Sequence, residues 1–105
     1  MIEKTIVIDD MPVKFAASAD TPRIYRNEFN ADMIKDLMQF KGADDFNIEI
    51  VNRVAYAMAK QANPEIEPCE EWLSQFGIFS IVAAMPEMIE LWGKNLATSA
   101  KAKKK

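Results

Sequence analysis

Pairs of carboxylates are the residues of this sequence whose spacing could do chemistry. Asp32 and Asp36 stand four positions apart and Glu87 and Glu90 three, so each pair shares a face where its segment is helical. Two carboxylates on one face could hold a hard cation or divide acid and base roles between them. No ligand loop surrounds either pair, however, and charged side chains are mostly solvated. We therefore interpret both pairs as surface charges, and the acidic pair at positions 44 and 45 as the approach to the next helix.

Nucleophilic chemistry has equally little support. The chain contains no histidine, the commonest general acid or base and the commonest transition-metal ligand. The single cysteine, Cys69, can form neither an intramolecular disulfide nor a cysteine-cluster zinc site. Its place near a helix start could lower the pKa of the thiol, but no histidine is present to activate it. We therefore expect a protein that is not an enzyme and that uses no cofactor or metal.

The charges divide into an acidic body and a basic end. Residues 1–100 contain nine basic and sixteen acidic residues, a net charge of −7, whereas residues 101–105 contain four lysines. An acidic body repels phosphate backbones, so we expect no nucleic-acid partner. A basic protein patch is a more natural partner. No apolar run approaches the roughly 18 residues that span a membrane, and residues 2–8 are typical of a strand rather than of a signal peptide.

The 105 residues fit one domain, and half of them are apolar. Residues 2–8 are rich in β-branched types, and Val13, Phe15 and Ala17 alternate with Lys14, so a β-hairpin is predicted over residues 2–18. A lone hairpin is marginal in water and must pack on helices. We expect an α+β fold that is mainly helical, with the hairpin packed against four or five helices. The globular domain is predicted to span residues 1–97, and residues 98–105 to form a flexible lysine-rich tail.

Helices are predicted between residues 22 and 94. Thr21 is a candidate N-cap for the first helix, and apolar residues then recur every four positions from Tyr25 to Leu37. Residues 46–62 form the clearest amphipathic helix, and a loop with two prolines separates it from a short helix at residues 69–76. A last helix is predicted from Ser80, with a kink or two abutting helices at Pro86. Its predicted apolar side consists of Ile81, Met85, Met88, Ile89 and Trp92.

Methionines and aromatic residues on these helices allow two interpretations. Each is most simply a core residue, but flexible thioethers and large rings also suit a surface that binds partners. Two arginines three positions apart could hold an acidic segment of a partner or only pair with acids at a helix start. The residues that we name as hypothetical partner contacts are Arg23, Tyr25, Arg26, Trp72 and Phe76.

Three segments carry a resemblance to a known family: "TPRIYRNEFNADMIKDL", "VAYAMAKQANPEI" and "EEWLSQF…MPEMIELWGKN". In this order, after a short hairpin and before a lysine-rich stretch, they resemble the tail assembly chaperones of long-tailed phages and prophages of low-GC Gram-positive bacteria. The resemblance spans residues 5–105. Each motif alone is weak, and the ordered set is fairly specific.

The resemblance implies a non-enzymatic role in the bacterial host cytoplasm. Such chaperones coat the long helical tape measure protein, help recruit tail tube subunits and leave the finished virion. The implied partners of this chain are therefore the tape measure protein, the tail tube protein and other copies of the chain. An acidic domain with methionine and aromatic anchors could cover apolar stripes on a rod, and many weak copies would bind it by avidity.

The lysines near the end also have two interpretations. In many such phages the short chaperone ends where ribosomes slip on A-rich codons, so consecutive lysines would reflect a constraint on the code. A flexible, solubilising tail explains them equally well. The alternative function is a small structural protein of the virion, such as a head–tail joining or tail-completion subunit, which would remain in purified particles.

Overall fold

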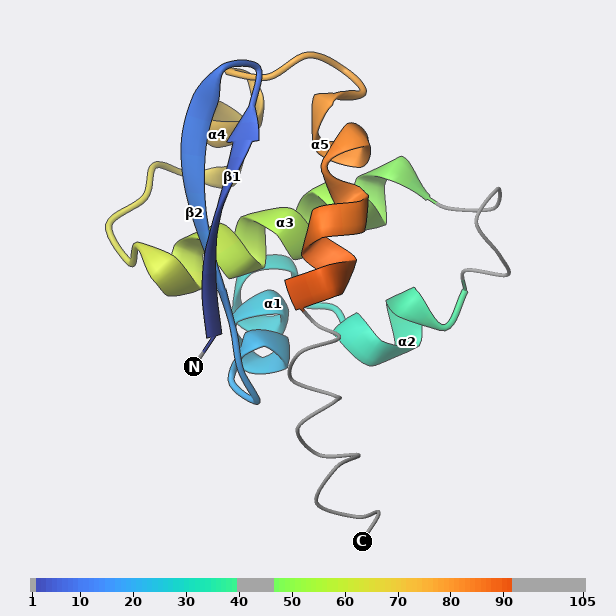
Figure 1. Ribbon diagram of the computed structural model, residues 1–105. Coiled ribbons are helices and arrows are strands. Elements are labelled where there is room, and N and C mark those ends of the chain that lie inside the picture. The colour runs from blue at the N-terminus through green and yellow to red at the C-terminus, as the bar shows by residue number, and fades with distance from the viewer. Residues whose placement is uncertain (1, 40–46, 92–105) are drawn as a thin grey trace, which may run out of the picture.

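The computed structural model describes residues 2–39 and 47–91. Strands β1 (Ile2–Ile8) and β2 (Met11–Ala17) form an antiparallel hairpin, in which Ile2 pairs with Ala17 and Ile8 with Met11. The helices are α1 (Thr21–Phe29), α2 (Met33–Leu37), α3 (Ile48–Ala62), α4 (Cys69–Leu73) and α5 (Ser80–Ala83), and residues 85–91 are also helical. Figure 1 shows the hairpin across one side of α3, with α1 and the stretch that contains α5 on other sides. The predicted α+β fold with an N-terminal hairpin packed on helices is confirmed.

A two-residue turn makes the hairpin. Asp9 and Asp10 both have positive φ, 52° and 65°, as a turn that matches the right-handed twist of the strands requires. Aspartate tolerates this backbone better than most residues because its short side chain can bond locally. Ile6 and Phe15 then face the core with no exposure, whereas Val7 and Lys14 point outward. The predicted alternation of Val13, Phe15 and Ala17 with Lys14 is confirmed.

Helix α3 is the centre of the fold. The side chain of Asn47 caps it by accepting from the amides of Glu49 and Ile50, at 2.9 and 3.2 Å. Eight of its fifteen residues are buried, because β2, α1 and α5 all pack against it. The buried residues of α3 are Ile50, Val51, Val54, Ala55, Tyr56, Ala57, Met58 and Ala59. The small alanines among them let neighbouring elements approach closely.

The last described helices begin where predicted at Ser80, but neither Thr21 nor Ser80 acts as the N-cap of its helix. Thr21 does not cap α1: its hydroxyl accepts from the backbone amide of Ser18 and donates to Oε1 of Gln61, at 3.0 and 2.6 Å. It thus ties the end of the hairpin to the end of α3. Ser80 is the first residue of α5 rather than its cap, and its hydroxyl donates to Asp9 at 2.8 Å. In both cases a tertiary partner competed successfully with the local amides.

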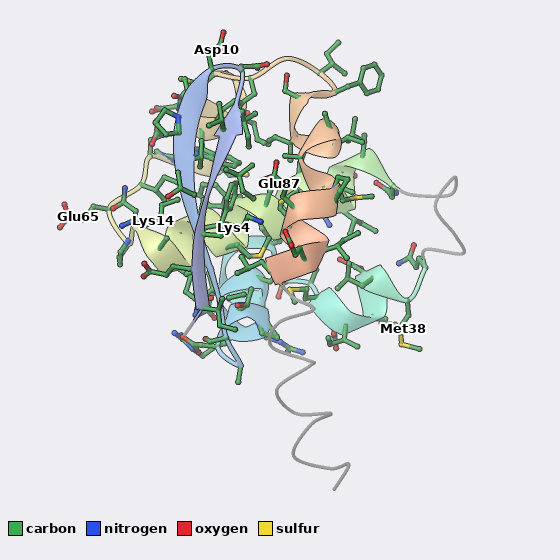
Figure 2. The ribbon with its side chains drawn as sticks, viewed as in Figure 1. Lys4, Asp10, Lys14, Met38, Glu65 and Glu87 are labelled. Atoms are coloured by element: carbon green, nitrogen blue, oxygen red, sulfur yellow. The ribbon has the colours of Figure 1, made fainter. Side chains whose placement is uncertain are left out.

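The C-terminal described helices agree with the predicted break at Pro86. Helix α5 ends at Ala83, Ala84 is in a turn, and residues 85–91 continue as a second helix. Ile81 and Met88 are buried as predicted, but Ile89 is half exposed because it lies off the buried face. Met38, one of the helical methionines for which a core position is the simplest interpretation, is instead 77% exposed and points outward from the end of α2 (Figure 2). The predicted break at Gly42, the side chain of Trp92 and the tail at 98–105 lie outside the described residues.

Candidate protein-interaction groove

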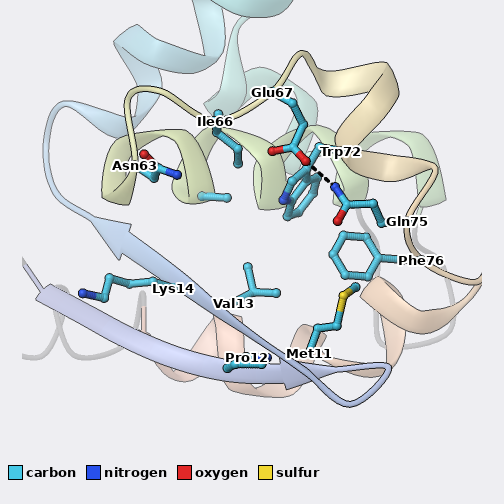
Figure 3. Close-up of a pocket in the computed structure, with 11 residues that line it drawn as sticks. Met11, Pro12, Val13, Lys14, Asn63, Ile66, Glu67, Trp72, Gln75 and Phe76 are labelled. Carbon is cyan, nitrogen blue, oxygen red and sulfur yellow. Dashed lines mark hydrogen bonds between the residues drawn. The ribbon is translucent and has the colours of Figure 1, made fainter.

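A groove of about 230 Å³ lies between β2, the α3–α4 loop and α4. Its lining residues are Met11, Pro12, Val13, Lys14, Ala59, Asn63, Ile66, Glu67, Trp72, Gln75 and Phe76. Figure 3 shows Met11 and Val13 on one side, Ile66 on another, and Trp72 with Phe76 opposite the strand. Apolar side chains therefore dominate a concave surface, as in binding sites for side chains of a partner.

Prolines in the loop and acidic residues at the start of α4 determine where two of these walls lie. Pro64 and Pro68 bracket the α3–α4 loop, so neither α3 nor α4 can extend through it. Helix α4 begins at Cys69 and carries Glu70 and Glu71 in its first turn, where the helix dipole favours acids. It turns Trp72 inward, and the Nε2 amide of Gln75 donates to Glu67 at 2.5 Å across one side of the groove.

Trp72 connects the groove to the core through a continuous row of rings. Tyr25, Phe29, Tyr56, Trp72 and Phe76 contact one another in that order, with centroids 5.2, 6.2, 5.6 and 5.0 Å apart. Every contact is close to edge-to-face, the favourable geometry for aromatic pairs. Trp72 and Phe76 at the end of the row line the groove, and Phe76 is half buried there. Packed rings therefore support this wall of the groove.

The five predicted contact residues do not form one site. Trp72 and Phe76 lie together in the groove, but Trp72 is only 4% exposed. Tyr25 has no exposure at all, and its hydroxyl donates to Asp36 at 2.6 Å. Burial in the core removes Tyr25 from any contact surface of this conformation, and leaves Trp72 as a supporting wall.

The two predicted arginines are exposed and lie outside the groove. Arg23 makes two hydrogen bonds to the carboxylate of Asp20, at 2.5 and 2.8 Å, beside a separate hollow between α1 and the end of α3. Arg26 lies 4.0 Å from Asp32. Exposed ion pairs of this kind hold their side chains weakly. Both arginines therefore remain available to an acidic partner, at a place distinct from the aromatic groove.

Acidic residues are concentrated on the loop and helix that form one wall of the groove. Glu67 lines the groove, Glu65 is its neighbour on the other side of Ile66, and Glu70 and Glu71 stand on α4; all four are exposed. Residues 61–93 contain six acids and no lysine or arginine. Within the groove, Lys14 supplies a basic group at the end near Asn63 (Figure 3). We call Glu65, Glu67, Glu70 and Glu71 the acidic rim.

The acidic rim could have been found from the sequence, but the groove could not. A run of 33 residues without a basic side chain is visible directly, and so are the glutamates on both sides of Ile66. Met11 and Val13 joined the groove unpredicted, because only the packing of β2 against α3 brings them opposite α4.

Residues considered for chemistry have structural roles here. Asp32 caps α2 by accepting from the amide of Lys35 at 3.1 Å, and Asp36 accepts from Tyr25. Burial, then the charge of Glu28, raises the pKa of the Cys69 thiol, opposite to the lowering considered from its place near a helix start. Within residues 2–39 and 47–91, no three side chains of the metal-binding types gather into a group.

Tyrosines and the hairpin tip show the other clear electrostatic effects. Burial, followed by the hydrogen bond to Asp36, raises the pKa of Tyr25 to about 12. Burial, followed by nearby carboxylates, raises the pKa of Tyr56 to about 12, and its hydroxyl donates to the backbone carbonyl of Glu67 at 2.7 Å. At the hairpin tip, the Gly77 amide and then the Ser80 hydroxyl lower the pKa of Asp9.

Several exposed apolar side chains lie away from the groove. Ile78 and Phe79 are 78% and 69% exposed in the loop before α5, and Asp9 holds the residues on either side of them. Val7, Ile34 and Ile89 are also at least half exposed. No helix of the described segments has the length and apolar character needed to cross a bilayer. Comparisons with protein families, curated proteins and solved structures find no match for this chain.

Proposed function

We propose that this chain is a phage tail assembly chaperone that binds the tape measure protein and tail tube subunits by reversible, non-enzymatic contacts. The ordered motifs that resemble this family support the proposal. The observation that carries it in the structure is the apolar groove of Trp72, Phe76, Val13 and Ile66, which offers a concave surface to side chains of a partner. Exposed Ile78 and Phe79 add a second apolar surface, as a protein that covers several stripes of a rod needs.

Single-site affinity need not be high in this role. A groove of about 230 Å³ accommodates one or two side chains rather than a whole helix, so one contact is expected to be weak. Many copies along one rod bind with far greater total strength, because each bound copy raises the local concentration of the next. Lateral contacts between copies would add to this effect, and self-association therefore belongs to the proposal.

Co-expression with the long helical tape measure protein encoded by the same phage or prophage tests this function. We expect the chain to keep that protein soluble and to purify with it. The test variant is Phe76→Leu, which alters the groove. Phe29→Leu is its matched control, because Phe29 is also half buried and stacked on two rings but does not line the groove.

The two variants separate binding from folding. Both shorten a half-buried ring and are expected to lose similar, moderate stability. Capture of the tape measure protein should fall only for Phe76→Leu. Equal loss of capture in both variants, or full capture by Phe76→Leu, would remove the groove from the binding surface. Failure of the unaltered chain to capture the protein would overturn the proposed function itself.

A further inference from the structure

We infer that the groove takes a basic amphipathic segment, in which an apolar side chain enters between β2 and α4 and lysines or arginines face the acidic rim. This inference deepens the proposed function by specifying the chemistry of the contact segment on the partner. It stands on two observations: an apolar hollow, and four exposed carboxylates on the loop and helix that form one wall of that hollow, of which Glu67 lines it.

The hollow determines the apolar part of the ligand. Val13 and Ile66 approach it from the strand and the loop, and the ring of Phe76 faces it from the end of α4 (Figure 3). Ring and branched aliphatic walls favour an aromatic or aliphatic side chain, because removing apolar area from water is favourable. The half-buried state of all three residues leaves apolar area for a partner to cover.

The acidic rim determines the charge of the ligand. Glu67 lines the groove next to Ile66, whereas Glu65, on the other side of Ile66, points away from the molecule in Figure 2, where a longer basic side chain of a partner can reach it. Glu67 uses one carboxylate oxygen to accept from Gln75, and its other oxygen can accept from a cation. An acidic segment would meet one opposite charge, Lys14, at one end of the groove, but four like charges on the loop and α4, and like-charge contacts oppose binding.

Charge also argues against the exposed pair Ile78 and Phe79 of a second copy as the occupant. That loop is held by Asp9, and Asp10 is the next residue of the same hairpin turn. Docking it into the groove would bring these aspartates toward the acidic rim. A basic segment of a different protein meets the opposite charge instead, and electrostatic attraction would speed its encounter.

The test uses the full chain and two synthetic helical peptides. One carries leucines and a phenylalanine along one face and lysines elsewhere; the other has glutamate in place of each lysine. Binding is followed by backbone amide chemical shifts and by the fluorescence of Trp72 in a Trp92→Phe background, where it is the only remaining tryptophan. We expect the basic peptide to bind and to shift amides of residues 11–14 and 63–76, and the acidic peptide not to bind.

Charge variants supply the quantitative control. Glu65→Gln with Glu67→Gln should weaken the basic peptide roughly 3- to 10-fold and reduce the salt dependence of binding. Glutamine at 67 can still accept from Gln75, so the wall is retained. Glu3→Gln with Glu87→Gln removes the same charge from exposed positions that do not line the groove, and should change affinity less than twofold.

Four results would overturn the inference. They are equal binding of both peptides, absence of binding by the basic peptide at millimolar concentration, shifts centred on Ile78 and Phe79, and equal effects of the two charge variants. A different result would assign the groove to the chain's own lysines. In that case the chemical shifts of the groove amides would change with salt in the absence of peptide, and this change would be lost when Lys101, Lys103, Lys104 and Lys105 are replaced by glutamine. None of these outcomes depends on capture of the tape measure protein, so the inference and the proposed function fail separately.

Discussion

Individual side chains show how the fold uses polar groups that could have served chemistry. Asp36 accepts the Tyr25 hydroxyl at 2.6 Å, and the Arg53 guanidinium lies 3.9 Å from the same carboxylate. Arg53 also bonds Glu49 at 2.9 Å and stands 5.6 Å from the centroid of the Phe29 ring. Each member of this cluster thus has a partner from another turn or helix. Because Asp36 is already paired with Tyr25 and Arg53, the two acids four positions apart in the sequence do not form a metal-binding or acid–base site.

The two tyrosines predict a loss of stability at alkaline pH. Both folded pKa values are about 12, whereas tyrosine in an unfolded chain ionises near 10. A raised folded pKa adds stability that is complete below pH ~10 and is lost as pH rises toward 12. Tyrosinate absorbance of the folded chain should therefore stay low at pH ~11, and the denaturation midpoint should fall between pH ~10 and 12.

Tyr25→Phe and Tyr56→Phe provide the controls, since these are the two tyrosines of the chain. Each variant should lose part of this alkaline dependence while remaining folded at neutral pH. Free titration of either tyrosine near pH 10 in the folded chain would show that its ring is not buried as described.

Elements meet most specifically where the hairpin tip contacts the loop before α5. Asp9 accepts from the Gly77 amide and the Ser80 hydroxyl, at 2.9 and 2.8 Å, across 68 and 71 positions of sequence. A Cβ on residue 77 would lie 2.9 Å from the Ser80 hydroxyl, so glycine permits the close approach. Figure 1 shows this loop passing over the tip of the hairpin. The contact holds the start of α5 against the turn.

Asp9→Asn should weaken this contact in a pH-dependent way. Asparagine tolerates the left-handed backbone, but its side chain has only one oxygen that accepts hydrogen bonds. It can therefore replace only one of the two carboxylate oxygens that Asp9 uses in this contact. A lowered folded pKa adds stability that is present above the ordinary aspartate value and is lost as pH falls through the folded pKa. The variant should therefore melt a few degrees lower than the unaltered chain at pH 7, with the difference shrinking below pH ~4.

Asp10→Asn is the matched control for that change. Asp10 has the same left-handed backbone, and the described residues show no hydrogen bond to its carboxylate. Its replacement should leave the melting temperature and its pH dependence nearly unchanged. Equal effects at positions 9 and 10 would mean that turn conformation, and not the tertiary contact, is responsible.

The individual strands and helices were the features that the sequence predicted most accurately. The hairpin, the buried face of α3 and the break at Pro86 follow from local periodicity and backbone chemistry, and the structure contains all three. Thr21 and Ser80 do not cap their helices, because the hydroxyl of each bonds a residue far away in the sequence, at distances of 40 and 71 positions. Periodicity marked Tyr25 and Trp72 as apolar-face residues but could not show that other elements cover them.

Across the whole molecule, the groove brings together parts that are remote in sequence. Met11 to Lys14 come from the hairpin, and Ile66 to Phe76 from the loop and α4 about fifty residues later. The acidic rim lies on the second of these segments and on the residue just before it, within a run that has no basic residue. An apolar hollow and a concentration of acidic residues therefore occur on the same part of the chain. This coincidence supports the proposed partner-binding function.

The most direct test of the proposed chaperone function measures the amount of this chain during and after the assembly of phage particles in a host that produces both. Quantitative mass spectrometry would compare complexes captured on the tape measure protein before tube formation with purified finished particles. An assembly chaperone should be abundant in the early complexes, in several copies per tape measure protein, and absent from the particles. A fixed number of copies retained in finished particles would contradict the chaperone proposal and identify a structural subunit.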